Sequence, residues 1–499
     1  MENIKITSDN ENYKNDYMEM VRAFNPYNDE DAENALEIKI HHEENYNFLE
    51  IVIFSRIYHN TFTAEMQNSA FKNMFGRDYV ITSITGLGMC RVFRNVVINS
   101  GDIMRARANA KRTAKLVIYE ELSELNGINL PYGSLTGIRP TKLYRETNED
   151  KAFFRDTLHV SEEKLSLIHN IVELQRKYYV VDDNVVDVFI NIPFCTTRCS
   201  YCSFISAEIG RVIKFIPEYV DCVVKEINDV KRIITYNNYK VRAVYIGGGT
   251  PTSLEDKYFE KILKECDFGA EEFTVEAGRP DSITKTKLEI MKDCGVTRIS
   301  INPQSFNEKT LSVIGRNHTI QEIYDVFNEA RGYDFAINMD LIAMLPGEDL
   351  DDFKFSVDEA IRLNPNNITV HTLALKKGSK LRENNYEQNM SSLAEQMVHY
   401  SREVLQEAEY KPYYMYRQKY MSGNLENTGY TKGEDVCLYN IDIMEESLSI
   451  IASGAGGISK RTFSDEHRLE RLANAKGLSV YLERIDSQIE KKFDFFKAK

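Results

Sequence analysis

Between residues 187 and 375 the chain alternates six short apolar runs with five longer amphipathic stretches. The apolar runs are DVFINIPF (187–194), VRAVYIGGG (241–249), EFTVEAG (272–278), TRISINPQS (297–305), FAINMDLIAM (335–344) and NITVHTLAL (367–375). Strand-length runs separated by helix-length stretches predict parallel strands that cross over through helices. Six such units are fewer than the eight of a closed barrel. We therefore expect a partial, TIM-like (β/α)6 barrel.

A polar or glycine-rich feature follows each of the six predicted strands. In chain order these features are a cysteine-rich loop, the sequence GGGTP, Glu276, Gln304, Asp340 and the pair His371 and Thr372. In parallel βα barrels the carboxyl ends of the strands and the loops after them build one shared site. The sequence therefore predicts that these features converge on a single site.

The pattern divides the chain into three parts. Residues 1–150 combine strand-like runs (37–42, 48–54 and 81–98) with a basic helical pattern from Asp102 that ends at Gly127. We expect a separate N-terminal α+β domain of unknown role, bounded by the Pro- and Gly-containing stretch 131–143. The barrel is predicted over 180–385. Residues 386–499 are expected to form a C-terminal α+β extension that covers the substrate. The predicted fold class is α/β.

Composition narrows the possible functions. The 499 residues carry a net charge of −14, which argues against a nucleic-acid-binding role based on overall charge. No apolar run approaches the ~20 residues that span a bilayer, and the polar N-terminus lacks the features of a signal peptide. We expect a cytoplasmic protein without a membrane span. Eight cysteines in a chain of this length do not form a disulfide scaffold.

Three of those cysteines, Cys195, Cys199 and Cys202, form a Cys-x3-Cys-x2-Cys motif on the loop after the first predicted strand. A structural zinc site usually needs four ligands, so zinc would require a distant Cys or His. Thiolates also suit iron–sulfur clusters. Three thiolates on a four-iron cube leave one iron open to the amino and carboxylate groups of S-adenosylmethionine (SAM). The reduced cluster can then cleave the sulfonium and release a 5′-deoxyadenosyl radical.

The GGGTP sequence (247–251) follows the second predicted strand. It lacks the Gly-Lys-Ser/Thr ending of a Walker loop and does not match the dinucleotide fingerprint G-x-G-x-x-G. Glycines allow a ligand's amino group to approach the backbone closely. A tight turn without a ligand is the alternative.

Taken together, these motifs resemble the radical SAM superfamily, including the aromatic Tyr201 before the third cysteine. The runs IPFCTTRCSYCSF, GGGTP, TVEAGRP, ISINPQSF, IGRNHT and MDLIAMLPGE resemble one branch, the oxygen-independent coproporphyrinogen III oxidase (coproporphyrinogen dehydrogenase) family with its heme-chaperone relatives. The resemblance covers about residues 185–380 and extends to GAGGIS (454–459). PYGSLTGIRPTKL and NLENTGY resemble the HemZ-type subgroup.

The resemblance implies a [4Fe-4S] cluster and SAM as cofactors. The implied cluster ligands are Cys195, Cys199 and Cys202. The implied SAM contacts are Phe189 and Tyr201, the backbone site Gly248, Gly249 and Thr250, Glu276 for the amino group, Arg316 for the carboxylate, Gln304 and Asp340 for the ribose, Ile342 and Thr372 beside the adenine, and Ile458 in a second ligand pocket.

The resemblance also implies the reaction. The radical would abstract hydrogen from a propionate of coproporphyrinogen III, which would lose CO2 and one further electron to become a vinyl group. Two such reactions would give protoporphyrinogen IX. A flavodoxin- or ferredoxin-like protein would supply the electron. The substrate's four carboxylates require cations, and the candidates are Arg417, Lys419, Lys460 and Arg461.

Three positions depart from the family pattern: Phe189 replaces a Tyr, Asn191 a His, and Phe204 a further Cys. These departures keep two alternatives open. One is a heme chaperone that retains the cluster, with His371, His318 or a tyrosine of 410–420 as heme ligand. The other is different radical chemistry on a tetrapyrrole or another substrate.

Overall fold

The computed structural model describes residues 3–25, 28–32, 36–42, 48–55, 82–86, 88–96, 103–204, 207–376, 378–384, 386, 391–419, 421–464 and 468–497. The chain forms two compact units. One contains residues 1–169 and 417–425, and the other contains residues 170–416 and 426–499. Within the described part, no helix combines the length and the apolarity needed to cross a bilayer.

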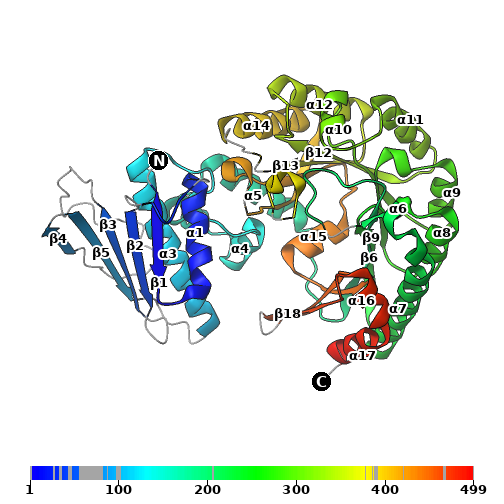
Figure 1. Cartoon of the computed structure of the whole chain (residues 1–499), viewed down its shortest axis with the longest axis horizontal. Coiled ribbons are helices and arrows are strands. Elements are labelled where there is room, and N and C mark those ends of the chain that lie inside the picture. The colour runs from blue at the N-terminus through cyan, green and yellow to red at the C-terminus, as the bar shows by residue number, and fades with distance from the viewer. Residues whose placement is uncertain are drawn as a thin grey trace. The chain divides into compact units, whose positions relative to one another are not determined.

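The N-terminal unit is built on a five-stranded sheet in the order β1-β2-β3-β5-β4. Its strands are β1 (Ile4–Ser8), β2 (Leu36–His42), β3 (Phe48–Ser55), β4 (Thr82–Gly86) and β5 (Gly88–Val96). Helices α1 (Glu11–Phe24) and α3 (Ile103–Asn126) lie against the sheet (Figure 1) and share its apolar core. As predicted, α3 stops before Gly127, whose φ of +64° suits the residue after a helix end. Further helical segments follow: α4 (Pro140–Glu146), η1 (Phe153–Thr157) and α5 (Glu162–Gln175).

The second unit contains the six predicted parallel strands. They are β6 (Val185–Ile192), β9 (Lys240–Gly248), β10 (Glu272–Gly278), β11 (Arg298–Ile301), β12 (Ala336–Ala343) and β13 (Asn367–Thr372). Each pairs in parallel with its successor. The main crossover helices are α7 (Ile216–Asn237), α8 (Asp256–Lys264), α9 (Lys285–Asp293), α10 (Glu308–Val313), α11 (Ile320–Arg331) and α12 (Leu350–Leu363), and they form the outer layer in Figure 1. The predicted α/β partial barrel is confirmed.

Segments after residue 386 extend this sheet at both edges. Strands β15 (Asn427–Lys432) and β14 (Tyr410–Tyr416) continue from β13 in antiparallel pairing. At the other edge, β16 (Ser449–Ser453) pairs in parallel with β6, and β17 (Ile458–Phe463) and β18 (Arg468–Ala473) follow. Most of the C-terminal extension thus belongs to the same unit as the barrel. Its helices are α14 (Ser391–Glu407), α15 (Leu438–Glu445), α16 (Leu478–Glu483) and α17 (Ile485–Phe496).

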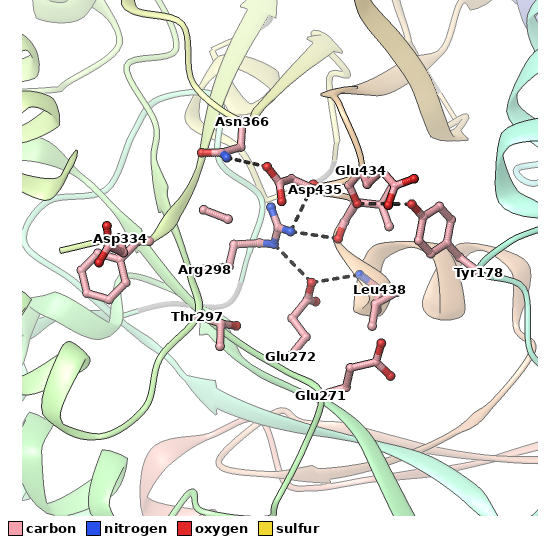
Figure 2. Close-up of a pocket in the computed structure, with 13 residues that line it drawn as sticks. Tyr178, Glu271, Glu272, Thr297, Arg298, Asp334, Asn366, Glu434, Asp435 and Leu438 are labelled. Atoms are coloured by element: carbon pink, nitrogen blue, oxygen red, sulfur yellow. Dashed lines mark hydrogen bonds and ion pairs between the residues drawn. The ribbon is translucent and has the colours of Figure 1, made fainter. Parts of the chain in front are cut away.

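The amino-terminal end of the barrel strands carries a buried polar network (Figure 2). Arg298 at the start of β11 donates to Glu272 at 3.2 Å and to the carbonyl groups of Asp435 and Val436. Glu272 also accepts from the backbone N–H of Leu438 at 3.1 Å. The segment before α15 is therefore fixed to the base of the barrel. A cavity of about 600 Å³ lies beside this network.

Candidate functional site

The three cysteines lie on a loop that the fold holds at several points. The loop begins with β7 (Phe194–Cys195), which pairs with β8 (Ala207–Glu208). The Ser200 N–H donates to the carbonyl of Ile314 at 3.0 Å, and the Cys202 N–H donates to the carbonyl of Cys199 at 3.1 Å. These bonds fix the backbone on which the thiols are mounted. The three thiols are free in the structure.

Arg279 is a loop-holding residue that the sequence analysis missed. It is buried at the end of β10, and its guanidinium makes a two-point contact with Asp281 at 2.9 Å. It also donates to the hydroxyl of Thr197 at 2.8 Å and lies 3.9 Å from Cys199 Sγ. Its position directly after the glycine that ends β10 is the signal that could have identified it. Arg279 places a positive charge beside the cysteine loop.

The thiols have the chemistry that an iron–sulfur cluster requires. Burial, with further contributions from the neighbouring Cys199 and Cys195, raises the pKa of the Cys202 thiol to about 11. A Cys202 thiolate is therefore unfavourable without a nearby cation, and cluster iron would supply that positive charge. Thr250 donates from its hydroxyl to Cys195 Sγ at 3.5 Å. The donor set fits a three-cysteine [4Fe-4S] cluster.

The three glycines of GGGTP are required by the packing of the protein itself. A Cβ on Gly248, whose φ is +101°, would lie 2.0 Å from Asn191 Oδ1. A Cβ on Gly249 would lie 2.4 Å from the carbonyl oxygen of Phe194, and one on Gly247 would lie 2.6 Å from Glu276 Oε2. Glycine here brings the β9 loop against β6 and the cysteine loop. Thr250 N–H completes the contact by donating to the Phe194 carbonyl at 2.6 Å.

Glu276 lies beside this glycine loop at the end of β10. Its carboxylate accepts from the Tyr245 hydroxyl at 2.9 Å and from the Gly248 N–H at 3.3 Å. Burial, with a smaller contribution from Asp340, raises the pKa of Glu276 to about 7. The carboxyl group therefore changes charge in the neutral pH range and would gain from a cationic ligand group. Tyr245 was not predicted from the sequence.

Tyr201, Gln304 and Arg316 form one connected group. The Tyr201 hydroxyl donates to Gln304 Oε1 at 3.1 Å, and the Arg316 guanidinium lies 3.4 Å from that hydroxyl. Arg316 is buried and also donates to the carbonyl of Asn302 at 2.5 Å. Gln304 has a φ of +68° and exchanges backbone hydrogen bonds with β12. Arg316 is thus fixed near the cysteine loop.

Asp340 is joined to His371 and Tyr416 across three strands. Asp340 Oδ1 accepts from the Asn338 side chain at 2.7 Å, and Oδ2 lies 3.6 Å from His371 Nε2. The other ring nitrogen of His371 lies 3.4 Å from the Tyr416 hydroxyl. Although burial acts in the opposite direction, His371 and the hydrogen bonds from Asn338 and Thr369 lower the pKa of Asp340. The carboxylate is therefore held ionised.

Phe189 belongs to an aromatic group inside the barrel. Its ring lies 6.0 Å from that of Tyr439, in a stacked arrangement, and 6.3 Å from that of Tyr245. Tyr245 and Tyr439 stack at 4.5 Å. Tyr439 comes from α15, so nothing in the local sequence of the barrel strands predicted it. The phenyl ring of Phe189 can make these ring contacts without the hydroxyl group that the family's Tyr would add.

The remaining predicted residues lie at strand ends. Ile342 is buried on β12 opposite His371. Thr372 is buried, and its hydroxyl donates to the carbonyl of Glu426 at 2.9 Å. Ile458 begins β17, is 41% exposed and pairs with Ala473 on β18. Three residues earlier, the Ala455 carbonyl accepts from the side chain of Asn191 on β6 at 2.5 Å.

Two of the four basic residues considered for substrate carboxylates donate hydrogen bonds to carbonyl groups of the protein itself. Arg417 is buried, and its guanidinium donates to backbone carbonyl groups of the N-terminal unit. Arg461 donates to backbone carbonyl groups near the end of the chain. Lys419 forms an ion pair with Glu19, and Lys460 lies on β17.

The histidines considered as heme ligands are also enclosed by protein groups. His318 has a fully buried side chain that lies 4.0 Å from Asp281. Burial and the nearby Arg316 lower the pKa of His318 to about 4, so the ring is neutral. Neither of its nitrogens has a hydrogen-bond partner among the described residues. His371 lies between Asp340 and Tyr416, so both of its ring nitrogens face protein groups.

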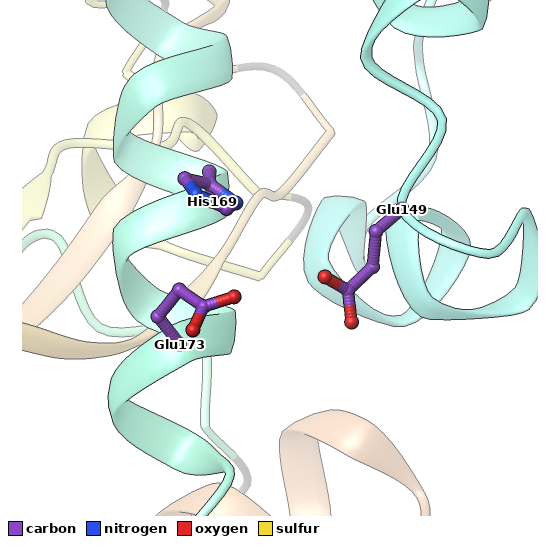
Figure 3. A group of neighbouring side chains, drawn as sticks. All are labelled: Glu149, His169 and Glu173. Atoms are coloured by element: carbon purple, nitrogen blue, oxygen red, sulfur yellow. The ribbon is translucent and has the colours of Figure 1, made fainter.

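Figure 3 draws another group of possible ligands, which carries no assignment. His169 and Glu173 are one helical turn apart on α5, and Glu149 is drawn with them. His169 Nδ1 lies 3.4 Å from the hydroxyl of Tyr144, so this ring has a protein partner. Exposed acidic side chains are common without a bound ion. We assign no metal to these residues.

Comparison with known proteins identifies the family. A model of the radical SAM superfamily matches residues 190–360. The chain is 36% identical over 414 residues to the oxygen-independent coproporphyrinogen-III oxidase-like protein HemZ of Bacillus subtilis (strain 168), covering 78% of this chain and 81% of that protein. The chain belongs to the radical SAM superfamily and to its HemZ-like group. Its cofactors are therefore a [4Fe-4S] cluster and SAM.

This radical SAM protein is also similar to a heme chaperone and to a solved structure. The heme chaperone HemW of Bacillus subtilis (strain 168) is 32% identical over 195 residues, and the match covers 38% of this chain and 50% of that protein. The structure of coproporphyrinogen III oxidase (HemN) from Escherichia coli matches with a TM-score of 0.50 and 20% identity, over 64% of this chain and 73% of that chain. The HemN likeness confirms the fold.

Proposed function

We propose that this chain is a radical SAM enzyme that oxidatively decarboxylates propionate side chains of coproporphyrinogen III. The observation that carries the proposal is the connected arrangement of the cysteine loop, the glycine loop and the polar strand ends of β10 to β13. The name of the HemZ relative supports a tetrapyrrole substrate. When bound, the cluster and SAM supply a 5′-deoxyadenosyl radical that takes a hydrogen atom from the substrate.

The residues of the chain would bind and orient SAM. Glu276 would accept from the amino group, and the fixed guanidinium of Arg316 would pair with the carboxylate, because a planar fork matches that group. Gln304 and Asp340 would hold the ribose hydroxyls. Ile342 and Thr372 would flank the adenine, and Ile458 would line a second ligand pocket. Residues 386–499 would cover the substrate.

Heme delivery is the second candidate function. Phe204, in the position of a further family cysteine, is 67% exposed, and the HemW match favours a heme-binding protein that keeps the cluster. The enclosed positions of His318 and His371 count against these two residues as heme ligands.

One anaerobic experiment separates the candidates. Reconstituted protein is incubated with SAM, dithionite and coproporphyrinogen III, and the products are analysed by liquid chromatography and mass spectrometry. We expect 5′-deoxyadenosine together with porphyrinogens that have lost one or two CO2 molecules. 5′-Deoxyadenosine with unchanged porphyrinogen would reject this substrate. Stoichiometric heme binding without turnover would favour the chaperone.

A further inference from the structure

The ion pair of Arg279 and Asp281 lies directly against the cysteine loop. Arg279 is 2% exposed, and its guanidinium donates to the Asp281 carboxylate through Nε and Nη2, both at 2.9 Å. The remaining nitrogen, Nη1, donates to the hydroxyl of Thr197 at 2.8 Å and to its carbonyl at 3.2 Å. The same Nη1 lies 3.9 Å from Cys199 Sγ, close enough for an N–H···S contact. All three guanidinium nitrogens therefore have partners.

The planar shape of the guanidinium determines the order of the charges. Nη1 lies on the side of the group opposite to the edge formed by Nε and Nη2. Asp281 occupies that edge and Cys199 faces Nη1, so the positive group lies between the carboxylate and the sulfur. Cys199 therefore faces the positive end of the ion pair.

The backbone on both sides of Arg279 is also restricted. Gly278 has a φ of +65°, a conformation that glycine adopts without steric cost. Pro280, whose ring limits φ, begins the short helix η4 (Pro280–Ser282). Together with the contacts to Asp281, this backbone holds the guanidinium in one position beside Cys199.

We propose that Arg279, oriented by Asp281, raises the reduction potential of the [4Fe-4S] cluster by stabilising its reduced state. Reduction adds one electron, and therefore one negative charge, to a cluster that is already anionic through its three thiolates. The guanidinium stabilises this added charge from the Cys199 side, and no bond forms or breaks. The inference goes beyond the proposed function, because it concerns the cluster and not the substrate.

Two physical arguments favour this role. Hydrogen bonds to the sulfurs and the charge around a cluster are among the factors that set its potential. Charges also interact more strongly in the protein interior than in water, because the effective dielectric constant is lower. Stability alone is a weaker explanation, because burying an ion pair costs desolvation free energy that the attraction between its charges offsets only in part.

Two other basic side chains near this ion pair have to be kept constant. Arg316 carries a second positive charge that interacts with the Cys199 thiolate. His318 lies 4.0 Å from Asp281, and burial lowers its pKa to about 4, so its ring is neutral at pH 8. Measurements at pH 8 without SAM leave the charges of both side chains unchanged between variants. Any difference in potential then comes from the Arg279–Asp281 pair.

The test changes one partner of the pair at a time. Arg279→Gln removes the positive charge, and Asp281→Asn removes the negative charge. The matched control, Arg362→Gln, removes the guanidinium of an ion pair with Glu359 on α12, where Arg362 is exposed. Each full-length protein is reconstituted anaerobically, and its iron and sulfide are quantified. Electron paramagnetic resonance then follows the reduced cluster during a potentiometric titration with titanium(III) citrate.

We expect Arg279→Gln to lower the ratio of reduced to oxidised cluster at least tenfold at a fixed electrode potential, which corresponds to about 59 mV for one electron. Asp281→Asn should raise that ratio several-fold, because the charge of Arg279 is then no longer compensated. Arg362→Gln should leave the ratio unchanged. A loosened cysteine loop, in contrast, would shift the potential in the same direction in both variants of the pair.

Three results would overturn the inference. The first is an Arg279→Gln variant with the potential of the wild type or of the control. The second is a shift of the same sign in Arg279→Gln and Asp281→Asn. The third is the failure of both variants to assemble a cluster, because the pair would then be needed to form the site and not to set its potential. If only one variant assembles a cluster, the sign of its shift decides.

Discussion

At the scale of single residues, the cysteine loop depends on Cys199, the most buried of the three thiols. We predict that Cys199→Ala removes the visible absorbance of the reconstituted cluster, because two remaining thiolates cannot hold a four-iron cube with one open corner. Cys266→Ala is the control, since Cys266 is also buried but donates to the carbonyl of Ile262 near the end of α8. Retention of the full absorbance in the Cys199 variant would exclude this ligand set.

Glu276 should make SAM binding depend on pH. Its pKa is raised to about 7, so its carboxylate is largely lost at pH 6 and largely present at pH 8. If the carboxylate accepts from the SAM amino group, affinity should fall about tenfold from pH 8 to pH 6. Equilibrium dialysis measures this change. Glu276→Gln should bind SAM more weakly and remove the component of pH dependence that comes from Glu276, and an unchanged profile in that variant would reject the role.

His371 should act as a positioning residue for Asp340. We predict that His371→Ala weakens SAM binding about tenfold while the cluster absorbance stays normal, because the ionised Asp340 loses a stabilising partner. Tyr416→Phe, which removes the more distant hydroxyl, should have a smaller effect. Replacing SAM by its 3′-deoxyribose analogue should lower the binding affinity less in the His371 variant than in the wild type. Equal losses would show that His371 does not act through the ribose site.

At the scale of elements, a buried ion pair fixes α17 to the barrel. Lys492 of α17 pairs with Glu226 of α7, and both side chains are almost completely buried. Glu226 also accepts from the Gly454 N–H at 2.7 Å, which links the pair to the GAGG loop. Removing one partner leaves an unpaired buried charge. We therefore predict that Lys492→Met lowers the free energy of unfolding by about 3–5 kcal/mol.

Urea denaturation measures this loss. Lys491→Met is the matched control, because Lys491 is the exposed neighbour on the same helix, and it should change stability by less than about 0.5 kcal/mol. The double variant Glu226→Leu with Lys492→Met should recover part of the loss. Equal stability of the two lysine variants would contradict the structural role of the pair.

The sequence located helices and strands correctly where their buried residues recur at a regular spacing. All six barrel strands were located from their apolar runs, and α3 was delimited by its glycine. The prediction for β11 was too long. The strand ends at Ile301, because Gln304 has a positive φ and keeps only a single bridge to Leu341. Such a backbone change is set by neighbouring strands and not by local sequence.

At the scale of the whole molecule, contacts between distant segments were the least predictable. The sequence indicated strand–helix material after residue 386, but not that β15 and β16 pair with opposite edges of the barrel sheet. Tyr439 enters the barrel from α15, 250 residues after Phe189. Arg279 follows a strand-end glycine and could have been found from the sequence, whereas Tyr245, the partner of Glu276, became visible only in three dimensions.

The central claim is that three thiolates hold a four-iron cluster whose open corner binds SAM. Electron paramagnetic resonance of the anaerobically reconstituted, dithionite-reduced protein tests it most directly. We predict a four-iron signal whose shape changes when SAM is added. The account would be contradicted by protein that forms no four-iron cluster, or by a cluster signal that SAM leaves unchanged.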